Sequence, residues 1–529
     1  MFYCGRRYSR RMASRRDFLK IAGALGVSQS PIAGAQADRR VRFDSYPFTL
    51  GVASGYPAPD GFVLWTRLAP RPLEPGGGLA PEIVPMRWEV AEDEGFRKVV
   101  ASRAEFPSQE WAHSVHAEVG GLEPDRWYFY RFLAGDAISP IGRTRTAPAT
   151  GAAVPRLRFA FASCQHYEHG YFSAYRHVVA DDLDLVVFLG DYIYESSLRR
   201  NQVRLHERAE EPVTLEEYRA RHAHYKSDPD LQSAHRAYPW IATLDDHEVD
   251  NDYANDRQED GAPPEEFLLR RAAAYQAYYE HLPLPRTMRP NGPDMRIHTT
   301  LAWGSLANFH LLDGRQYRSP QACPRKAGGA NEVDPGACAE LRAPARTMLG
   351  AEQEAWLERQ FIAARASWNL IAQQTLMAQL DTRPGDGQRI WTDNWDGYPV
   401  ARRRLLESVA ARKLANPVVI GGDVHMNFVA DLKLDFDDPR SPVVASEFVG
   451  TSITSPAGPW QRNLPAILAE NPHIKYGRGD RRGYVRASIA GGRFNADLIG
   501  LDTVKKPDSR AEVLARFVVE DGRPGPRPG

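Results

Sequence analysis

The stretch LDLVVFLGDYIYE, residues 183–195, decides the fold. It begins with a nearly continuous apolar run, which is typical of a strand buried on both faces of a sheet. The run ends at Gly190 and Asp191, so a carboxylate stands at the rim of a dry core, where an anionic oxygen needs a cation. The stretch therefore predicts a buried strand that carries a functional acid at its carboxyl end.

Three other stretches repeat this design: RFAFASC (158–164), WIATLDDHEVDND (240–252) and NPVVIGGDVHMN (416–427). In each, metal-capable side chains follow an apolar strand. Because sites in open α/β sheets form at the carboxyl ends of strands, we expect these side chains to lie together. A solvated acidic loop is the alternative for residues 245–252. The candidates that the four stretches supply are Cys164, Asp191, Tyr194, Asp246, His247, Asp423 and His425.

Residues 41–147 predict a small all-β domain. The runs GFVLWTRL, MRWEVAED and RWYFYRFL alternate apolar with polar residues and are separated by Gly/Pro turns, which favours a sandwich. The segment LEPDRWYFYRF (122–132) resembles a late strand of fibronectin type III-like domains. We interpret His113 and His116 as surface residues of these strands and not as ligands.

Residues 155–515 alternate strands with helices, which predicts an α/β domain whose sheet is covered on both faces. The amphipathic run 351–366 is one expected helix, and the run 214–226 is another, placed over the site together with His222, His224 and His235. We expect residues 516–529 to form a flexible C-terminal tail.

Residues 1–37 predict an export signal. Arg15 and Arg16 precede Phe18-Leu19-Lys20, a weakly apolar segment and an A-x-A end, which resembles the twin-arginine signal; a basic flexible tail is the alternative. The segment holds seven basic residues and one acidic residue, so its removal takes a chain of net charge zero to −6. We expect a periplasmic or secreted protein that uses the twin-arginine export machinery, without a nucleic-acid surface or a stable membrane anchor.

The cysteines fit an oxidising compartment. Cys323 and Cys338 lie 15 residues apart in a Pro/Gly-rich loop, and we expect them to form a disulfide. Cys4 lies in the signal segment and is expected to be removed with it. Cys164 then remains as an unpaired thiol, which needs an explanation in an exported protein.

The order of Cys, GDxxY, DDHE and GDxH resembles that of the calcineurin-like metallophosphoesterases, in particular the PhoD-like alkaline phosphatases and phosphodiesterases. The resemblance covers nearly all of the chain after residue 37. It implies a metallophosphoesterase β-sandwich core flanked by helices at 155–515, preceded by the all-β domain. It also implies Fe(III), with ligands Cys164, Asp191, Tyr194 and His425, and Ca²⁺, with ligands Asp191, Asp246, Asp423 and Asn251. Ligand softness agrees, because thiolate, phenolate and imidazole suit a transition metal whereas carboxylate and amide oxygens suit calcium.

We predict hydrolysis of phosphate monoesters, and of diesters, by a metal-activated hydroxide. His247 is expected to steady the phosphate and to protonate the leaving alcohol, with a structural role as the alternative. The residues expected to line the substrate pocket are Asn394, Trp395 and Tyr398 of NWDGYP, together with Gln165 and Tyr192; a Trp cluster that caps the core is the alternative for the first three. His166 and His169 are expected to be solvated, with at most an electrostatic role.

Three other functions stay open. A phosphodiesterase or phospholipase D-like enzyme that prefers lipid or nucleotide diesters would use the same metals. A non-catalytic cell-envelope binding protein would be expected to have lost one of the ligands. A cysteine hydrolase with Cys164 as nucleophile would leave the carboxylate cluster unexplained.

Overall fold

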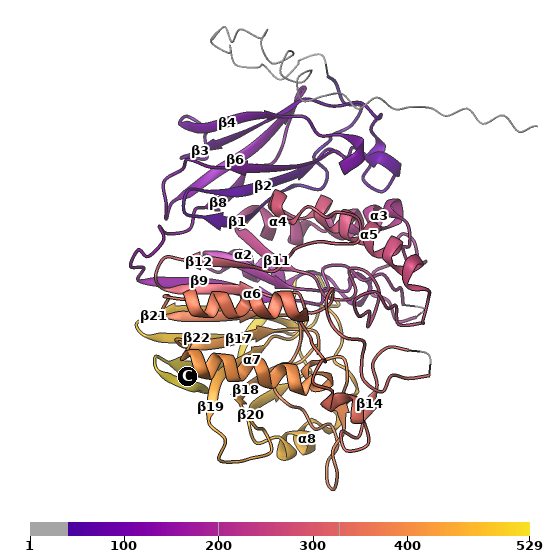
Figure 1. Cartoon of the computed structure of the whole chain (residues 1–529). Helices are drawn as coiled ribbons and strands as arrows, with labels where there is room; N and C mark the ends of the chain where they lie inside the picture. The colour runs from indigo at the N-terminus through magenta and orange to yellow at the C-terminus, as the bar shows by residue number, and fades with distance from the viewer. Residues whose placement is uncertain (1–40, 199, 327) are drawn as a thin grey trace, which may run out of the picture.

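The computed structural model describes residues 41–198, 200–326 and 328–529 (Figure 1). The export signal expected at 1–37 lies outside the described residues. Within the described chain, no helix combines the length and apolar character that a membrane span requires.

Two large mixed sheets form the centre of the molecule. The first sheet has ten strands, and its middle consists of three parallel strands, β9 (Arg156–Ala162), β10 (Leu185–Leu189) and β11 (Pro239–Thr243). On one side it continues into β21 (Gly483–Ala490), β22 (Arg493–Leu501), β23 (Ala511–Glu520) and β24 (Arg523–Pro528). On the other side it continues into β1 (Val52–Ala58), β2 (Gly61–Arg67) and β5 (Ser114–Val119).

The second sheet has seven strands and packs on the first. Its order is β12 (Thr299–Trp303), β13 (Ala307–Leu311), β15 (Trp368–Ala372), β17 (Pro417–Gly421), β19 (Val443–Val449), β18 (Asn427–Lys433) and β20 (Ile474–Arg478). Apolar side chains from both sheets form one buried cluster, in which Phe159 meets Phe309 edge to face with ring centroids 5.2 Å apart.

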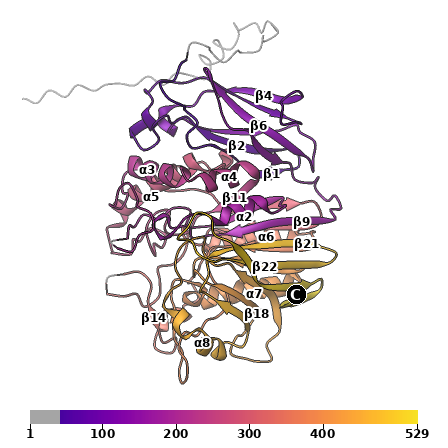
Figure 2. The same ribbon diagram turned by 180° about the vertical axis from the view of Figure 1, so that it is seen from behind.

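Helices cover the two outer faces, so the domain has four layers (Figures 1 and 2). The first sheet packs against α2 (Ala174–Ala180), α3 (Leu215–Lys226), α4 (Pro229–Ala237) and α5 (Pro264–His281). The second packs against α6 (Gly350–Ala363), α7 (Pro399–Arg412) and α8 (Leu464–Glu470). Burial on both faces explains why the central strands are continuously apolar.

The N-terminal segment forms the expected antiparallel β domain. A five-stranded sheet of β3 (Met86–Ala91), β4 (Val99–Glu105), β6 (Trp127–Ala134), β7 (Ala137–Ile138) and β8 (Gly142–Arg145) packs on β1, β2 and β5. β1 also pairs in parallel with β11, with Ser54 opposite Pro239 and Gly55 opposite Trp240. The small domain is therefore fastened to the large one by a continuous sheet. The predicted fold class is confirmed.

Two sequence predictions are wrong. Residues 516–529 are not a flexible tail, because β23 and β24 add two antiparallel strands to the edge of the ten-stranded sheet. His113 and His116 are buried instead of exposed. His116 stacks on Tyr279 of α5 with ring centroids 4.0 Å apart, so it packs the small domain against the helices.

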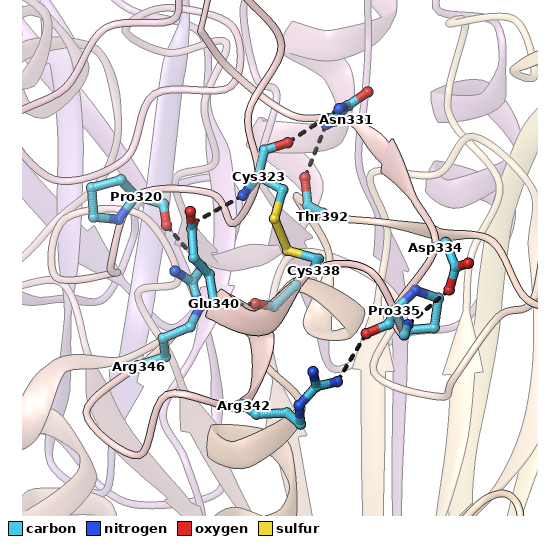
Figure 3. The surroundings of a disulfide bond; sticks show 12 residues. Pro320, Cys323, Asn331, Asp334, Pro335, Cys338, Glu340, Arg342, Arg346 and Thr392 are labelled. Carbon is cyan, nitrogen blue, oxygen red and sulfur yellow. Dashed lines mark hydrogen bonds between the residues drawn. A yellow bond between two sulfur atoms is a disulfide. The ribbon is translucent and has the colours of Figure 1, made fainter.

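The expected disulfide is present (Figure 3). Cys323 and Cys338 close a loop whose short strand β14 (Glu332–Val333) pairs with β16 (Ile390–Trp391). The amide of Asn331 donates to the carbonyl of Cys323, and its backbone N–H donates to Thr392 Oγ1. The loop is thus held both covalently and by hydrogen bonds to the segment that follows β16.

Candidate metal centre

The carboxyl ends of strands from both sheets meet at one place. Cys164 follows β9, Asp191 follows β10, and Asp246 follows β11 in the first sheet; Asp423 and His425 follow β17 in the second. All of these except Asp246 have positive φ, between 55° and 62°. Such backbone costs free energy in residues other than glycine, and it persists where the surrounding structure enforces it, commonly at functional sites.

Two glycines permit this convergence. A Cβ on Gly190 would lie 2.5 Å from the Cβ of Asp245, and a Cβ on Gly422 would lie 2.2 Å from Ser163 Oγ. The latter contact joins the end of β17 to the residue before Cys164, that is, one sheet to the other. The Gly-Asp pairs of the sequence are therefore explained by close approach between strand ends.

The first group of candidate ligands comprises Cys164, Asp191 and His425, with one donor atom from each within 4.8 Å of the others. The hydroxyl of Tyr194 lies among them: it donates to Asp191 Oδ2 at 2.8 Å and lies 3.1 Å from His425 Nε2. Ser455 Oγ donates to the same hydroxyl at 2.9 Å. The structure thus brings together the four side chains that the resemblance implied as iron ligands.

The orientation of His425 suits metal binding. Its Nδ1 lies 2.9 Å from the carbonyl oxygen of Pro456, an acceptor that assigns the proton to Nδ1 and leaves the Nε2 lone pair facing the group. Burial lowers the pKa of this histidine to about 3, so the ring is neutral, as a ligand must be.

The second group comprises Asp191, Asp246 and His247. His247 Nδ1 lies 2.7 Å from Glu195 Oε2, and its ring stacks on Tyr194 with centroids 4.1 Å apart. Burial alone would lower the pKa of His247, but the carboxylates of Glu195, Asp246 and Asp191 raise it well above its ordinary value. A protonated imidazole therefore stands beside the two aspartates.

The third group, Asp246, Asp252 and Asp393, was not predicted from the sequence as a set. It lies against Arg315, whose side chain is fully buried and which binds Asp393 Oδ2 at 2.7 Å and Asp245 Oδ1 at 2.5 Å. Arg315 lies in LDGRQY just after β13, where its sequence context alone gives no signal. Only the fold shows that it neutralises acids from two distant segments, Asp245 with Asp246 and Asp393.

The centre holds more negative charge than its arginine and histidine neutralise. Burial raises the pKa of Asp191 well above its ordinary value, and burial with the Asp246 charge raises that of Asp423 to about 7. Burial also raises the pKa of the Cys164 thiol, and Asp191 and Asp423 add to the effect. At Asp246 the opposite holds, because Arg315 and His247 outweigh burial and lower the pKa. The burial and negative charge that raise the pKa values of these groups also favour the binding of a metal cation at the same place.

A direct test of fit comes from buried oxygens. Among the described residues, Asp191 Oδ1 and Asp246 Oδ1 are buried and have no hydrogen-bond partner. Buried carboxylate oxygens are rarely left in this state, because the loss of hydration is costly. Both atoms belong to the predicted ligand sets, so the residues present fit a metal centre, and Asp191 is common to two of the groups. Thr375 Oγ1 donates to Asp423 Oδ2 at 2.5 Å and so orients a further acid.

The structure also gives the surroundings of Asn251 and His166. Asn251 is close in sequence to the acids, but its side-chain amide donates to Glu259 and its backbone N–H to Glu195. Its expected calcium role stays a prediction. His166 is buried, not solvated, and its ring packs 4.5 Å from that of Tyr194.

The expected substrate pocket is not formed by the expected side chains. Trp395 and Tyr398 are buried in the core between α6, α7 and the second sheet, where Trp395 Nε1 donates to Gln373 and the Tyr398 hydroxyl donates to Ser319. These two aromatic rings therefore have no surface on which a substrate could stack. Three further residues expected there are also buried and held by internal hydrogen bonds: Asn394, Gln165 and Tyr192.

A pocket of 530 Å³ does adjoin the centre, and its lining includes Asp423 and His425. Its aromatic residues are Trp391 and Trp460, which the sequence did not single out. Trp391 stands three residues before Asn394, the first residue of the segment that was expected to line the pocket. Burial alternates along β16, where Ile390 is buried and Trp391 is partly exposed. This alternation is the signal that could have identified Trp391.

The fold and the site together define a four-layered α/β protein with a multi-acid candidate metal centre between its sheets. Residues 159–498 match the family model described as "PhoD-like phosphatase", and residues 33–148 match "PhoD-like phosphatase, N-terminal domain". Alkaline phosphatase D of Bacillus subtilis (strain 168) is 46% identical over 526 residues, which cover 97% of this chain and 88% of that protein. A solved structure described as "Structure of PhoD" superposes with a TM-score of 0.87 at 46% identity, covering 92% of this chain and 93% of the other. The chain belongs to the PhoD-like phosphatase family.

Proposed function

We propose that this protein is an exported, metal-dependent phosphatase that hydrolyses phosphate monoesters and diesters. The observation that carries the proposal is that, in the described part of the chain, Asp191 Oδ1 and Asp246 Oδ1 are buried without a hydrogen-bond partner, and that Asp191 belongs both to the group with Cys164 and His425 and to the group with Asp246 and His247. The likeness to alkaline phosphatase D, at 46% identity, supports the same reaction class.

We assign Fe(III) to Cys164, Asp191, Tyr194 and His425, and Ca²⁺ to Asp191, Asp246 and Asp423, with Asn251 as a further ligand. The soft thiolate and the imidazole favour a transition metal on one side, and the all-oxygen set favours calcium on the other. Metal ions at these positions would neutralise the phosphate charge and lower the pKa of water for attack on phosphorus.

The protein's own contribution is the placement of His247. Glu195 accepts from Nδ1 and keeps the ring protonated, so the Nε2–H is directed away from Glu195 and is free to donate. The imidazolium donates to a phosphate oxygen while negative charge accumulates, and it passes this proton to the leaving alkoxide. Arg315 does not reach substrate, because it is fully buried among Asp245, Asp246 and Asp393.

The test is metal analysis together with activity. Mature protein, prepared from cells that supply iron and calcium, is analysed for both metals and assayed with p-nitrophenyl phosphate and bis-p-nitrophenyl phosphate. We expect both metals, activity on both esters and a visible tyrosinate–iron colour. Cys164→Ser should lose iron and colour while it keeps the circular dichroism of the parent. An iron-free, colourless parent with full activity would refute the iron assignment.

The export part of the proposal rests on residues 1–37 alone. Fractionation of cells that produce the full chain should place the protein outside the cytoplasm. Replacement of Arg15 and Arg16 by lysine should retain it inside, because the route depends on that arginine pair. Export that is unaffected by the double replacement would argue for another route.

A further inference from the structure

The pocket beside the candidate metal centre is larger than a phosphate group needs, and its lining includes side chains that hydrolysis of a phosphate ester does not require. Asp423 and His425 belong to its lining, which also includes Trp391, Trp460, Arg325 and Asn331. At 530 Å³ it has the size of a small-molecule site and exceeds what a phosphate group needs. An ester whose phosphoryl group binds at the candidate centre would have room for its organic part in this pocket.

The two tryptophans are held in place by one acid. Glu332 stands opposite Trp391 in the β14–β16 pair, and its Oε1 accepts from Trp460 Nε1 at 3.1 Å. Trp460 comes from the 3-10 helix η7 (Pro459–Asn463), far away in sequence. Both indoles are partly exposed. Through the strand pairing and the hydrogen bond, Glu332 connects two separate segments and fixes both indoles as walls of the pocket.

A cation completes the wall. The guanidinium of Arg325 lies 5.1 Å from the ring centroid of Trp391, and its side chain is about half exposed. Arg325 belongs to the loop that the Cys323–Cys338 disulfide closes. Indole faces and a planar guanidinium are the groups on which flat aromatic rings, nucleobases above all, stack.

We propose that Trp391, Trp460 and Arg325 form a specificity site for the alcohol part of the substrate, and that this part is a planar aromatic ring such as a nucleobase. The inference deepens the proposed function, because it assumes that the phosphate of the same ester binds at the metal centre. Aliphatic alcohols such as glycerol have no flat face and gain little from the three side chains.

The test compares two esters of primary alcohols, so that the leaving groups are matched. Values of kcat/KM are measured for adenosine 5′-monophosphate and glycerol 3-phosphate in the parent, Trp391→Leu and Trp460→Leu. We expect each variant to lose about tenfold on the adenosine ester and less than about twofold on the glycerol ester. Trp111→Leu is the matched control, because Trp111 also has an arginine, Arg289, over its ring (3.7 Å to the centroid) but lies in the small domain. It should change neither value.

A second readout needs no catalysis. Saturation-transfer NMR with free adenosine and free glycerol reports contact with the protein in the absence of phosphate. We expect a signal for adenosine alone, lost in Trp391→Leu and Trp460→Leu and retained in Trp111→Leu. Equal losses on both esters, or an adenosine signal that the two variants leave intact, would overturn the specificity site. If the parent cleaves neither of these esters nor p-nitrophenyl phosphate, yet binds adenosine through these tryptophans, the proposed phosphatase function fails and the aromatic site stands.

Discussion

Glu195 Oε2 lies 2.7 Å from His247 Nδ1, and the same carboxylate accepts the backbone N–H of Asn251 through its other oxygen. One acid thus orients the histidine and also shapes the loop behind it. His247 in turn lowers the pKa of Glu195 although burial acts to raise it. The two side chains form a mutually stabilised ion pair at the edge of the candidate metal centre.

Glu195→Gln should therefore lower kcat by about 100-fold with little change in KM. Without the carboxylate, the pKa of His247 falls toward its ordinary value, so the ring loses its proton at a lower pH. The alkaline limb of the kcat–pH profile should shift to lower pH. Steady-state kinetics across pH measures both effects.

The control for this prediction is a double-mutant cycle. If Glu195 acts through the histidine, Glu195→Gln combined with His247→Gln should be no slower than His247→Gln alone. Losses that multiply in the double variant would show that Glu195 has a separate role.

Arg315→Met should reduce the free energy of unfolding by about 3–5 kcal/mol, because it leaves the buried Asp245 without its cationic partner and leaves Asp393 with Arg318 as its remaining cation. Denaturant titration measures the loss. Arg403→Met is the matched control: Arg403 is mostly exposed and pairs with Glu407 one helical turn away, so it should cost at most about 1 kcal/mol. Similar losses in both variants would contradict the assigned role of Arg315.

The pair Cys323→Ser and Cys338→Ser should loosen the loop that bears Arg325. Opening a 15-residue loop removes a constraint worth about 3 kcal/mol to that segment. Limited trypsin digestion should then cleave after Arg325 and Lys326 faster than in the oxidised parent. Unchanged cleavage would mean that the hydrogen bonds of Asn331 and the β14–β16 pair hold the loop by themselves.

His222→Phe should make the protein more tolerant of acid. Among the described residues, neither ring nitrogen of this buried histidine has a hydrogen-bond partner, and burial lowers its pKa to about 3. The unfolded chain takes up the proton near pH 6.5, so this histidine costs stability as the pH falls from about 6.5 toward 3. At pH 5 the cost is about 2 kcal/mol. Unfolding free energies of parent and variant should diverge by that amount between pH 7.5 and 5; parallel curves would contradict the prediction.

The sequence predicted the strand-end residues well because the information is local. A buried strand followed by Gly-Asp specifies both the strand and the place where the acid must stand, so Cys164, Asp191, Asp246 and His425 could be grouped from the pattern of the strands alone. The same logic failed for Trp395 and Tyr398. An aromatic residue near a loop has the same local pattern whether it faces the core or a pocket, and only the packing of α6 and α7 decides.

The missed residues depend on long-range contacts. Arg315 and Asp393 are 78 residues apart, and Trp460 reaches the pocket through a bond to Glu332, 128 residues away. The C-terminal strands were missed for a related reason. VLARFVVEDGRPGPRPG is rich in Pro and Gly near its end, but an edge strand tolerates such residues because one side of its backbone has no partner.

Removal of metal should lower the free energy of unfolding of the parent, and this loss should be much smaller when Asp191 is replaced. A metal that binds only the folded state, at a free concentration 100 times its dissociation constant, adds about 2.7 kcal/mol to the free energy of unfolding. Chelation should remove this contribution. Asp191→Asn deletes the proposed bridging charge, so the variant should gain little from metal. Without metal it should be more stable than the parent, because burial and Asp246 already oppose the charged form of Asp191.

Asp497→Asn, at a surface pair with Arg486, is the control and should respond to metal as the parent does. Thermal unfolding with and without chelator measures all three proteins; an Asp191→Asn variant that keeps the parent's full metal-dependent shift would remove Asp191 from the centre.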